Sequence, residues 1–599
     1  MRKKKFVCLE VILINIVDVD KSAEKCAAAR QEADEAIKQN KLLQGLSHLN
    51  QAVMLAPTEE DNLTQLAESL FHRSKTLLAL GHHDLALRDA SLAAIKGGFP
   101  ETSLFSLYLH QAKCHEAIKC AFEAQKCYNR AISALDKSDL DQGARDAEKR
   151  SIQEALNSLN KDKTAKAKIA ASNKNEDVLD ITRKHSKYQS LSKHVGIKYS
   201  KEHGRFAVAM EDIRPGTVLG VEDPIVSCLD EEFLQFKCLN CFKSVLAGLP
   251  CHTCSNVVFC SLECRRQAIS SFHKYECQNM HLLKTGPNYL ALRAVTQNSV
   301  EYFLENRLKK FENYNETSGT ELEEAKSYTS NDMKNLFNLS TKNTDIEKEM
   351  EIYMIAAYLL KILQSMNYFD LEKKTESSLT EEEVYIGMLL SRFVAVAESN
   401  SHLICQAPNE SQNIKSLPEL LQLNFEPQQI GFGINSTLAF FNHSCNPNTV
   451  KIQRGKKTFL IASQNIKKGD EIFDNYGSLF YTTEKVQRNN DLGFECNCEA
   501  CEGNWQKYRF LSDKIDDPSG DAANVGEAAR RQLEKGRAAN NLMQKMNSEL
   551  GLGHFNKVLL LSGEYRKLLD HLVTHPHRFY FNTYMIMFYC YWIRYGNKN

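Results

Sequence analysis

Closely spaced cysteines constrain this chain more than any other feature of its sequence. Most of the nineteen cysteines in 599 residues lie in two tracts, one in the middle of the chain and one near residue 500. A gap of two or three residues between cysteines lets both side chains converge on one ion across a turn or a single helical turn. Because the chain has no clear secretory signal, such pairs favour metal binding over disulfides.

The middle tract holds enough ligands for two metal sites. Eight soft or borderline ligands fall within 40 residues, as the pairs Cys238/Cys241, Cys251/Cys254, Cys260/Cys264 and His273/Cys277. Four such ligands fill a tetrahedral zinc site and leave no open position, so we expect these zinc ions to be structural and not catalytic. A segment this short has little core of its own, and the metal would supply much of its folding free energy. The alternative is a set of unconnected core cysteines.

The composition is that of an ordinary globular protein with several domains. For 599 residues we expect about three to five domains. The 43% hydrophobic and 25% charged residues exclude a wholly disordered or collagen-like chain. Lysine plus arginine equals aspartate plus glutamate at 75 each, so the net charge is zero and offers no general attraction to nucleic acid. We therefore expect no sequence-specific nucleic-acid binding.

Two segments at the ends of the chain resemble targeting or membrane sequences only superficially. Met1–Lys5 is basic and Phe6–Val19 is mostly apolar, but polar residues interrupt the apolar run and no small-x-small cleavage site follows at once. We interpret residues 1–21 as a leader or an alternative start. Phe579–Ile593 is too short to cross a bilayer, which needs about 20 residues, and is expected to be a buried helix. We expect no membrane association, and a location in the cytoplasm and nucleus.

Residues 22–160 have the composition and punctuation of a helical repeat. They hold little glycine or proline and much alanine, leucine, lysine and glutamate, which favours helix. Small side chains let the two helices of a hairpin approach closely, and Pro57 and Pro100 close the first two units. The pattern resembles tetratricopeptide repeats, although its spacing is looser than their ~34 residues; a plain helical bundle is the alternative. Such a solenoid presents a concave face to peptide partners. The small residues recur seven apart, in units that start 41 and then 38 residues apart: Gly45/Ala52, Ala86/Ala93 and Ala124/Ala131.

Three other segments complete the division of the chain. Residues 161–190 are polar and rich in lysine, and we expect a linker or a solvated helix. Residues 312–349 form a polar, acidic insertion that is typical of a surface loop or a disordered excursion. Residues 505–599 return to a helical composition and predict a helical C-terminal domain, short enough to be incomplete.

Motifs on both sides of the middle tract appear in a distinctive order. Before it come His203-Gly204-Arg205 and short β-prone runs separated by glycine and proline, which predict strands. Downstream lie Asn442-His443-Ser444-Cys445-Asn446-Pro447-Asn448, then Glu471-Ile472-Phe473-Asp474-Asn475-Tyr476-Gly477, and then Phe494 before Cys496, Cys498 and Cys501. This ordered set resembles the SET domain of protein lysine methyltransferases, and the middle tract resembles the MYND zinc finger. Together they resemble the SET and MYND family, specifically the member with an N-terminal tetratricopeptide region.

The resemblance implies a multidomain α+β fold. A TPR-like helical repeat would be followed by a β-rich SET domain, split and with its post-SET segment, at residues 191–501. The MYND finger would be inserted at residues 238–277, and a helical C-terminal domain would follow. The family interleaves the two finger zinc sites and adds a third, post-SET zinc. The implied ligand sets are Cys238, Cys241, Cys260 and Cys264; Cys251, Cys254, His273 and Cys277; and Cys445, Cys496, Cys498 and Cys501.

The resemblance also implies S-adenosylmethionine as cofactor and a protein as substrate. It puts Asn442 and His443 at the amino acid and adenine ends of the cofactor, with Phe494 stacked on the base. MYND fingers generally bind short proline-containing peptides, so peptide partners are expected at the repeat and at the finger, on a monomeric chain. The remaining implied cofactor contacts are His203, Gly204, Arg205, Asn400 and Tyr476.

The implied reaction is an SN2 transfer of a methyl group from a sulfonium to a lysine amine. The barrier falls when donor and nucleophile are held in line and when a neutral amine is desolvated. Because free lysine has a pKa near ~10.4, the site must help it lose a proton. Tyr476 is our candidate for the catalytic residue, since a tyrosine ring can wall an apolar channel while its hydroxyl orients amine and methyl group.

Two departures from the family pattern favour a second function. Phe206 stands where many relatives have glycine and would narrow the cofactor entrance. Leu492 stands where relatives often have tyrosine, which removes one orienting hydroxyl from the lysine channel. Both favour a non-catalytic adaptor that recruits protein partners around a degenerate SET core. The retained Tyr476 and the post-SET cysteines favour methyl transfer.

Overall fold

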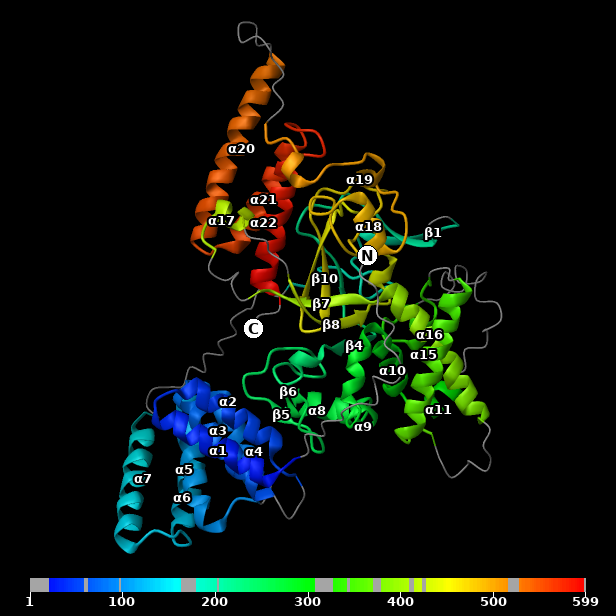
Figure 1. The fold of residues 1–599 in the computed structure, drawn as a ribbon. Coiled ribbons are helices and arrows are strands. Elements are labelled where there is room, and N and C mark those ends of the chain that lie inside the picture. Colours follow the sequence, from blue (N-terminus) through cyan, green and yellow to red (C-terminus); the bar gives the residue numbers. More distant parts are fainter. Residues whose placement is uncertain are drawn as a thin grey trace. The chain divides into compact units, whose positions relative to one another are not determined.

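The chain folds into two compact units, whose elements are labelled in Figure 1. The first unit combines the N-terminal helices with the finger segments Glu232–Asn240 and Val245–His281, and the second holds the SET region and the C-terminal helices. The predicted leader, apart from Lys21, lies outside the described residues, as does His203. This computed structural model describes residues 21–58, 63–95, 98–162, 179–201, 204–306, 327–341, 345–369, 379–408, 414–422, 427–514 and 527–596.

The N-terminal helices form three hairpins that follow one another along the chain (Figure 1). Each hairpin turn contains one residue with a left-handed backbone, namely Asn40 (φ 59°), Gly81 (φ 82°) and Lys119 (φ 62°). A single left-handed residue reverses the chain tightly between two helices. The hairpins are α1 (Ala23–Lys38) with α2 (Leu42–Leu55), α3 (Leu63–Ala79) with α4 (His83–Ile95), and α5 (Leu104–Ala117) with α6 (Ala121–Leu135), and α7 (Gln142–Asp162) follows.

Small residues bring the helices of each hairpin together, as the sequence predicts. Ala52, Ala86 and Ala131 are fully buried on the second helices of the three hairpins. A Cβ atom added at Gly45 would lie 2.6 Å from Cγ1 of Ile37 on the facing helix, so only glycine permits this approach. The helical-repeat part of the predicted fold class is confirmed.

The finger is a two-stranded hairpin followed by two short helices. Leu249 pairs with Phe259, and Ser261 caps the first helix by accepting a hydrogen bond from the Cys264 amide. The finger also packs on the repeat, because Ala247 is fully buried in one hydrophobic cluster with Leu46 of α2. The elements are β5 (Leu249–Pro250), β6 (Val258–Phe259), α8 (Leu262–Ile269) and α9 (His273–Glu276).

Small antiparallel sheets form the SET region, as the β-prone runs predict. Their strand orders are β1-β2, β3-β10-β9 and β4-β8-β7. Gly431 lets two strands approach closely, since an added Cβ would collide with the Cys228 carbonyl oxygen. The strands are β1 (Val195–Ser200), β2 (Gly204–Ala209), β3 (Val218–Glu222), β4 (Val226–Leu229), β7 (His402–Gln406), β8 (Gln428–Ile434), β9 (Thr449–Arg454) and β10 (Lys457–Ala462).

Helices surround these sheets within the second unit. α15 and α16 form a hairpin, and a capping box between Thr380 and Glu383 starts α16. The helices of this region are α10 (Tyr289–Thr296), α11 (Val300–Glu305), α14 (Met333–Phe337), α15 (Ile346–Ser365), α16 (Glu381–Asn400), α17 (Leu417–Gln422), α18 (Lys485–Leu492) and α19 (Glu499–Glu502).

Two segment predictions are wrong in part. Residues 312–349 do not form a continuous surface loop, because Leu336 and Phe337 are buried on α14 and α15 begins inside the segment. Residues 161–190 are not all linker, because Ile181 and Tyr188 are buried in their second half. In both cases a polar average composition conceals a few apolar residues, and burying those residues outweighs the surrounding charge.

The C-terminal segment is helical, as predicted. It consists of α20 (Glu527–Gly551), α21 (Phe555–Leu569) and α22 (Arg578–Tyr595). The tyrosine-rich α22 packs against β9, and its Trp592 is 1% exposed, so the expectation of a buried helix holds. Among the described helices, none is at once long enough and apolar enough to cross a membrane.

Candidate active site and metal centres

A cavity of about 710 Å³ lies in the second unit between three loop segments. This volume is within the ~300–1,000 Å³ range typical of small-molecule sites. Four residues that the sequence predicts for the site meet at this cavity: Asn442, His443, Tyr476 and Phe494. The other lining residues are Ser444, Asn446, Asn448, Gln464, Asp470, Glu471, Phe473, Cys496, Asn497, Cys498 and Glu499.

Asparagine side chains hold two of these segments side by side. The Asp474 amide donates to the Asn442 carbonyl, and the Ser444 amide donates to the Asp474 carbonyl, each at 2.9 Å. The Asn442 side chain donates to the Glu471 carboxylate at 2.8 Å, and the Asn448 side chain donates to the Glu471 carbonyl at 2.9 Å. The segment of residues 442–448 therefore uses its amides to position the loop that carries Tyr476.

A buried carboxylate fixes the chain just before Asn442. Glu222 at the end of β3 accepts hydrogen bonds from the amides of Thr437 and Leu438, each at 2.9 Å, and from the Ser436 hydroxyl at 3.2 Å. Burial raises the pKa of Glu222, and these hydrogen bonds oppose that rise. The carboxylate thus anchors the short helical turn Leu438–Phe440 that leads into the site.

Tyr476 lies at the junction of the two held segments. Its hydroxyl donates to the Phe441 carbonyl at 2.7 Å, and its amide donates to Nδ1 of His443 at 3.0 Å. The residue as a whole is 41% exposed, and the ring centroids of His443 and His402 lie 5.3 and 6.0 Å from that of Tyr476. Desolvation of the hydroxyl raises the pKa of Tyr476, so the phenol stays protonated.

His443 is a neutral imidazole in a defined tautomer. Because Nδ1 accepts from the Tyr476 amide, the ring proton is on Nε2, which lies 3.4 Å from the Cys445 sulfur. Desolvation by burial lowers the pKa of His443 to about 4. Phe494 packs edge-on against this ring at 6.2 Å and is itself 41% exposed, which leaves part of its surface open to a ligand.

Two residues that the sequence did not single out support Tyr476. The Lys451 ammonium on β9 donates to Asp474 at 2.6 Å and to the Asn475 carbonyl at 3.2 Å, so it fastens the loop just before Tyr476. Burial and the nearby Lys451 lower the pKa of His402 to about 4. Neither Lys451 nor His402 was part of a motif that the sequence analysis used, so only contacts in the folded chain identify these two residues.

Three residues predicted at the cofactor do not line the cavity. Gly204 and Arg205 are on β2, and Arg205 instead donates to the Asn338 carbonyl at 2.8 Å and lies over the Phe440 ring at 4.7 Å. Asn400 ends α16 and donates to the carbonyls of Ser340 and Val396. The structure therefore keeps these three apart from the other four.

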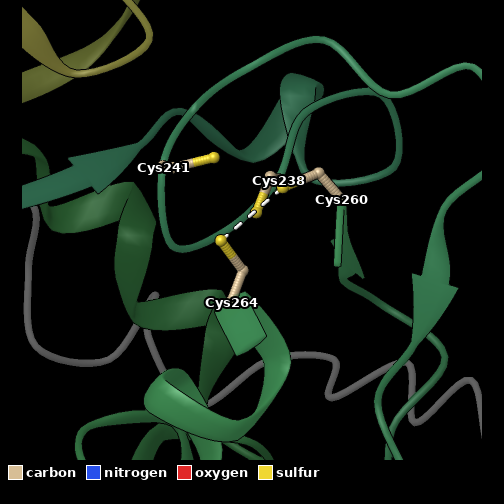
Figure 2. Close-up of side chains that lie close together, drawn as sticks. All are labelled: Cys238, Cys241, Cys260 and Cys264. Carbon is tan, nitrogen blue, oxygen red and sulfur yellow. Dashed lines mark hydrogen bonds between the residues drawn. The ribbon is translucent and has the colours of Figure 1, made fainter. Parts of the chain in front are cut away.

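The cysteines and histidine form three tetrads that match the three predicted ligand sets. In each tetrad the ligand atoms all lie within 4.8 Å of one another, and Figure 2 shows the first, from Cys238 to Cys264. Zinc–sulfur bonds of about 2.3 Å place the sulfurs of a tetrahedral site about 3.8 Å apart. Selected sulfur pairs fit this spacing: Cys260–Cys264 at 3.5 Å, Cys251–Cys277 at 3.8 Å and Cys445–Cys501 at 3.6 Å. The donor sets are consistent with zinc.

The third tetrad adjoins the cavity. Its Cys445 and Cys501 are fully buried in one cluster with Phe480 and Leu492. Cys496 and Cys498 also line the cavity, and Phe494 precedes them by only a few residues. A metal in this tetrad would therefore hold part of the cavity wall in place.

The cavity also suits the predicted cofactor chemically. The carboxylates of Asp470 and Glu471 can accept hydrogen bonds from hydroxyl or ammonium groups, and the side chain of Asn442 is polar at the same wall. The rings of Phe494 and Tyr476 supply flat apolar surfaces for a base and for a methyl group.

Comparison with known proteins agrees with this geometry. The SET domain model matches residues 204–477. The protein-lysine N-methyltransferase SMYD4 of Pongo abelii is 24% identical over 72% of this chain and 61% of its own length, and SMYD4 of Homo sapiens is 24% identical over 72% and 62%. The chain thus spans about three fifths of the length of these relatives. One solved structure, the first TPR of Spaghetti (RPAP3) bound to an HSP90 peptide, aligns with 23% of this chain over 96% of its own length. The alignment has 18% sequence identity and a TM-score of 0.18.

The fold and the SET match at residues 204–477 define a SET domain protein with three cysteine-rich tetrads consistent with zinc and a TPR-like helical repeat. The particular relatives it resembles are the SMYD4 protein-lysine methyltransferases, so the resemblance to the SET and MYND family is confirmed.

Proposed function

We propose that this chain is a protein-lysine N-methyltransferase that uses S-adenosylmethionine. The observation that carries the proposal is the placement of Tyr476, which lines the cavity while its hydroxyl is held by the Phe441 carbonyl. The SET match and the SMYD4 relatives support the same reaction.

The residues at the cavity would divide the work of binding and orientation. Asn442, His443 and Phe494 would hold the cofactor, which when bound supplies an electrophilic methyl group on a sulfonium. Tyr476 would keep the lysine nitrogen in line with that methyl group, so that a C–N bond forms as the C–S bond breaks. The Phe441 carbonyl accepts a hydrogen bond from the Tyr476 hydroxyl, and this bond fixes the direction of the phenolic oxygen.

The amine must be neutral when it attacks. The surroundings of Tyr476 favour this, because the desolvation that lowers the pKa of His402 and His443 to about 4 disfavours any cation there. A protonated lysine entering such a site would lose much of its hydration, which lowers its pKa toward the working pH.

The test is methyl incorporation with radiolabelled cofactor on a peptide array, preceded by calorimetry of cofactor binding. We expect the wild type to bind cofactor and label peptides, and Tyr476→Phe to keep binding while turnover falls by about 100-fold or more, as for loss of one orienting hydrogen-bonding group. Turnover that survives the substitution would remove Tyr476 from its role. Exposed Tyr199 on β1 offers a matched control, and Tyr199→Phe should behave as wild type.

A non-catalytic adaptor is the second candidate, and one observation favours it. Leu492 is 7% exposed and packs against the third tetrad, so no hydroxyl is offered at this position. Wild-type protein that is folded and zinc-loaded, yet binds no cofactor and labels no peptide, would leave the adaptor. Both proposals include peptide partners at the repeat and at the finger, and the methyltransferase proposal adds a protein substrate.

A further inference from the structure

Arg488 is a buried cation that contacts the third tetrad directly. It lies on α18 and is 2% exposed. Its Nε donates to the Cys445 sulfur at 3.0 Å and one Nη donates to the Cys501 sulfur at 3.2 Å. The other Nη donates to the Thr483 carbonyl. The guanidinium is thus held by three acceptors, two of which are metal-ligand sulfurs.

Charge balance gives this contact its importance. Four thiolates around one Zn²⁺ carry a net charge of −2, whereas a tetrad with three thiolates and a neutral histidine, such as that of Cys251, Cys254, His273 and Cys277, carries −1. Burying an uncompensated double charge is costly. The Arg488 guanidinium halves the net charge of the third site and forms charge-assisted hydrogen bonds to two of its thiolates.

The same residue links the metal site to the cavity. α18 ends at Leu492, and Gly493 turns the chain with a left-handed backbone (φ 68°) before Phe494. Arg488 therefore ties the helix that precedes this turn to the sulfurs of Cys445 and Cys501. Loosening the tie would free Phe494 relative to His443, against which it packs.

We propose that Arg488 is a positioning residue of the third metal site: its guanidinium hydrogen-bonds two zinc thiolates, balances their charge, and thereby retains the metal and the cavity wall beside it. The proposal rests on zinc occupying the tetrad and does not require the chain to methylate any substrate. Residues that hydrogen-bond metal ligands typically change metal affinity by about 10–100-fold when mutated.

The experiment measures zinc release from purified full-length protein into excess chelator, followed with a chromogenic zinc indicator. For Arg488→Gln we expect one of three zinc equivalents to leave about 10-fold faster or more, with the other two unchanged. Lys485→Met is the matched control, because Lys485 is on the same helix and donates to the Cys501 carbonyl and not to a sulfur. It should release zinc within about two-fold of the wild-type rate, as expected for loss of a single hydrogen bond that leaves the hydrogen bonds to the four sulfurs intact.

A spectroscopic readout separates this role from a merely structural one. In cobalt-substituted protein, loss of N–H···S hydrogen bonds makes the thiolates more electron-rich and should move the sulfur-to-cobalt charge-transfer band to longer wavelength in Arg488→Gln but not in Lys485→Met. Three zinc equivalents released from Arg488→Gln at wild-type rates would overturn the proposal. If Arg488→Gln does not fold, Arg488→Lys replaces it, because lysine keeps the charge but cannot reach two sulfurs as a fork; faster release supports the proposal and wild-type release overturns it.

Failure of this proposal and failure of the methyltransferase proposal are distinguishable. Zinc content and release are measured without cofactor or substrate, so a wild type without turnover still reports on Arg488. Conversely, Tyr476→Phe should retain all three zinc equivalents at wild-type rates, since Tyr476 contacts none of the four sulfurs through the hydrogen bonds described above.

Discussion

At the scale of single residues, the histidine and tyrosine rings of the candidate site are kept uncharged. His402 and His443 have pKa values near 4 because burial disfavours the imidazolium, and Tyr476 stays protonated for the corresponding reason. Lys451 beside these rings is charged and pairs with Asp474. This ion pair therefore holds the Tyr476 loop, beside a cavity that is lined both by the neutral rings and by the carboxylates of Asp470 and Glu471.

His402 makes the stability of the fold depend on pH. Its pKa of about 4 in the folded chain lies below the 6.5 of an unperturbed histidine, so the unfolded state binds more protons between these values. Stability from this residue is present above pH 6.5, falls as the pH drops toward 4, and the loss amounts to about 3 kcal/mol. Denaturant unfolding at pH 7 and pH 5 should show a smaller drop for His402→Gln than for wild type.

The control for that measurement is an exposed histidine. His82→Gln in the turn between α3 and α4 should leave the pH dependence as in the wild type. An identical drop in wild type and His402→Gln would contradict the assignment of this pH dependence to His402.

At the scale of elements, side chains of the helical repeat hold the finger by hydrogen bonds to its backbone carbonyls. Asn50, Arg88 and Arg73 donate to the carbonyls of three consecutive finger residues, Leu246, Ala247 and Gly248. Arg73 also pairs with Asp89 at 2.6 Å, and both side chains are almost fully buried. The repeat thus binds backbone carbonyls of another segment of this same chain, a kind of contact that solenoids also make with peptides.

Breaking this contact should destabilise the first unit strongly. Arg73→Met leaves Asp89 buried without its closest partner and frees the Gly248 carbonyl, which is expected to cost about 3–5 kcal/mol. Thermal unfolding monitored by circular dichroism, with hydrogen exchange of residues 246–248, measures the effect. Lys126→Ala removes a surface pair with Glu123 and should cost under about 1 kcal/mol. Equal losses of stability for Arg73→Met and Lys126→Ala would contradict a stabilising role of the Arg73 contact.

At the scale of the whole molecule, the tetrads bring together segments that are far apart in sequence. The third tetrad joins Cys445 to cysteines more than fifty residues later, and the second joins the strand end at Cys251 to α9. The finger buries several apolar side chains, among them Leu239, Val257 and Phe259, and metal in its two tetrads would supply further folding free energy.

Removal of zinc should therefore unfold parts of the chain selectively. We expect about three zinc equivalents per chain by elemental analysis, and chelation should expose the amides of residues 238–277 and 494–501 to fast hydrogen exchange. The hairpins α1–α6 should retain most of their helical signal, because their cores are formed by apolar side chains. Re-addition of zinc should restore protection. Unchanged exchange in both segments after the metal has gone would refute a structural role.

Much of the fold and of the site could be predicted from local sequence patterns. The ligand pairs depend on spacings of a few residues, and their grouping into three sets followed from the family resemblance. The helical hairpins depend on small residues and on turn positions that recur 41 and 38 residues apart. Asn442, His443, Tyr476 and Phe494 lie within such motifs, and the folded chain brings them to one cavity. The structure of segments 161–190 and 312–349 was harder to predict, because their average polarity masks the few apolar residues that become buried.

The sequence by itself thus determined which residues could bind metal and which motifs contribute to the site, since ligands a few residues apart in sequence converge across a single turn. Only the tertiary structure decided which distant groups support them. Lys451 meets Asp474 across 23 residues, Arg488 meets Cys445 across 43, and Arg73 meets Gly248 across 175. Such contacts depend on the path of the backbone through the whole fold. A charged side chain is buried beside its partner only after folding has removed water from around both.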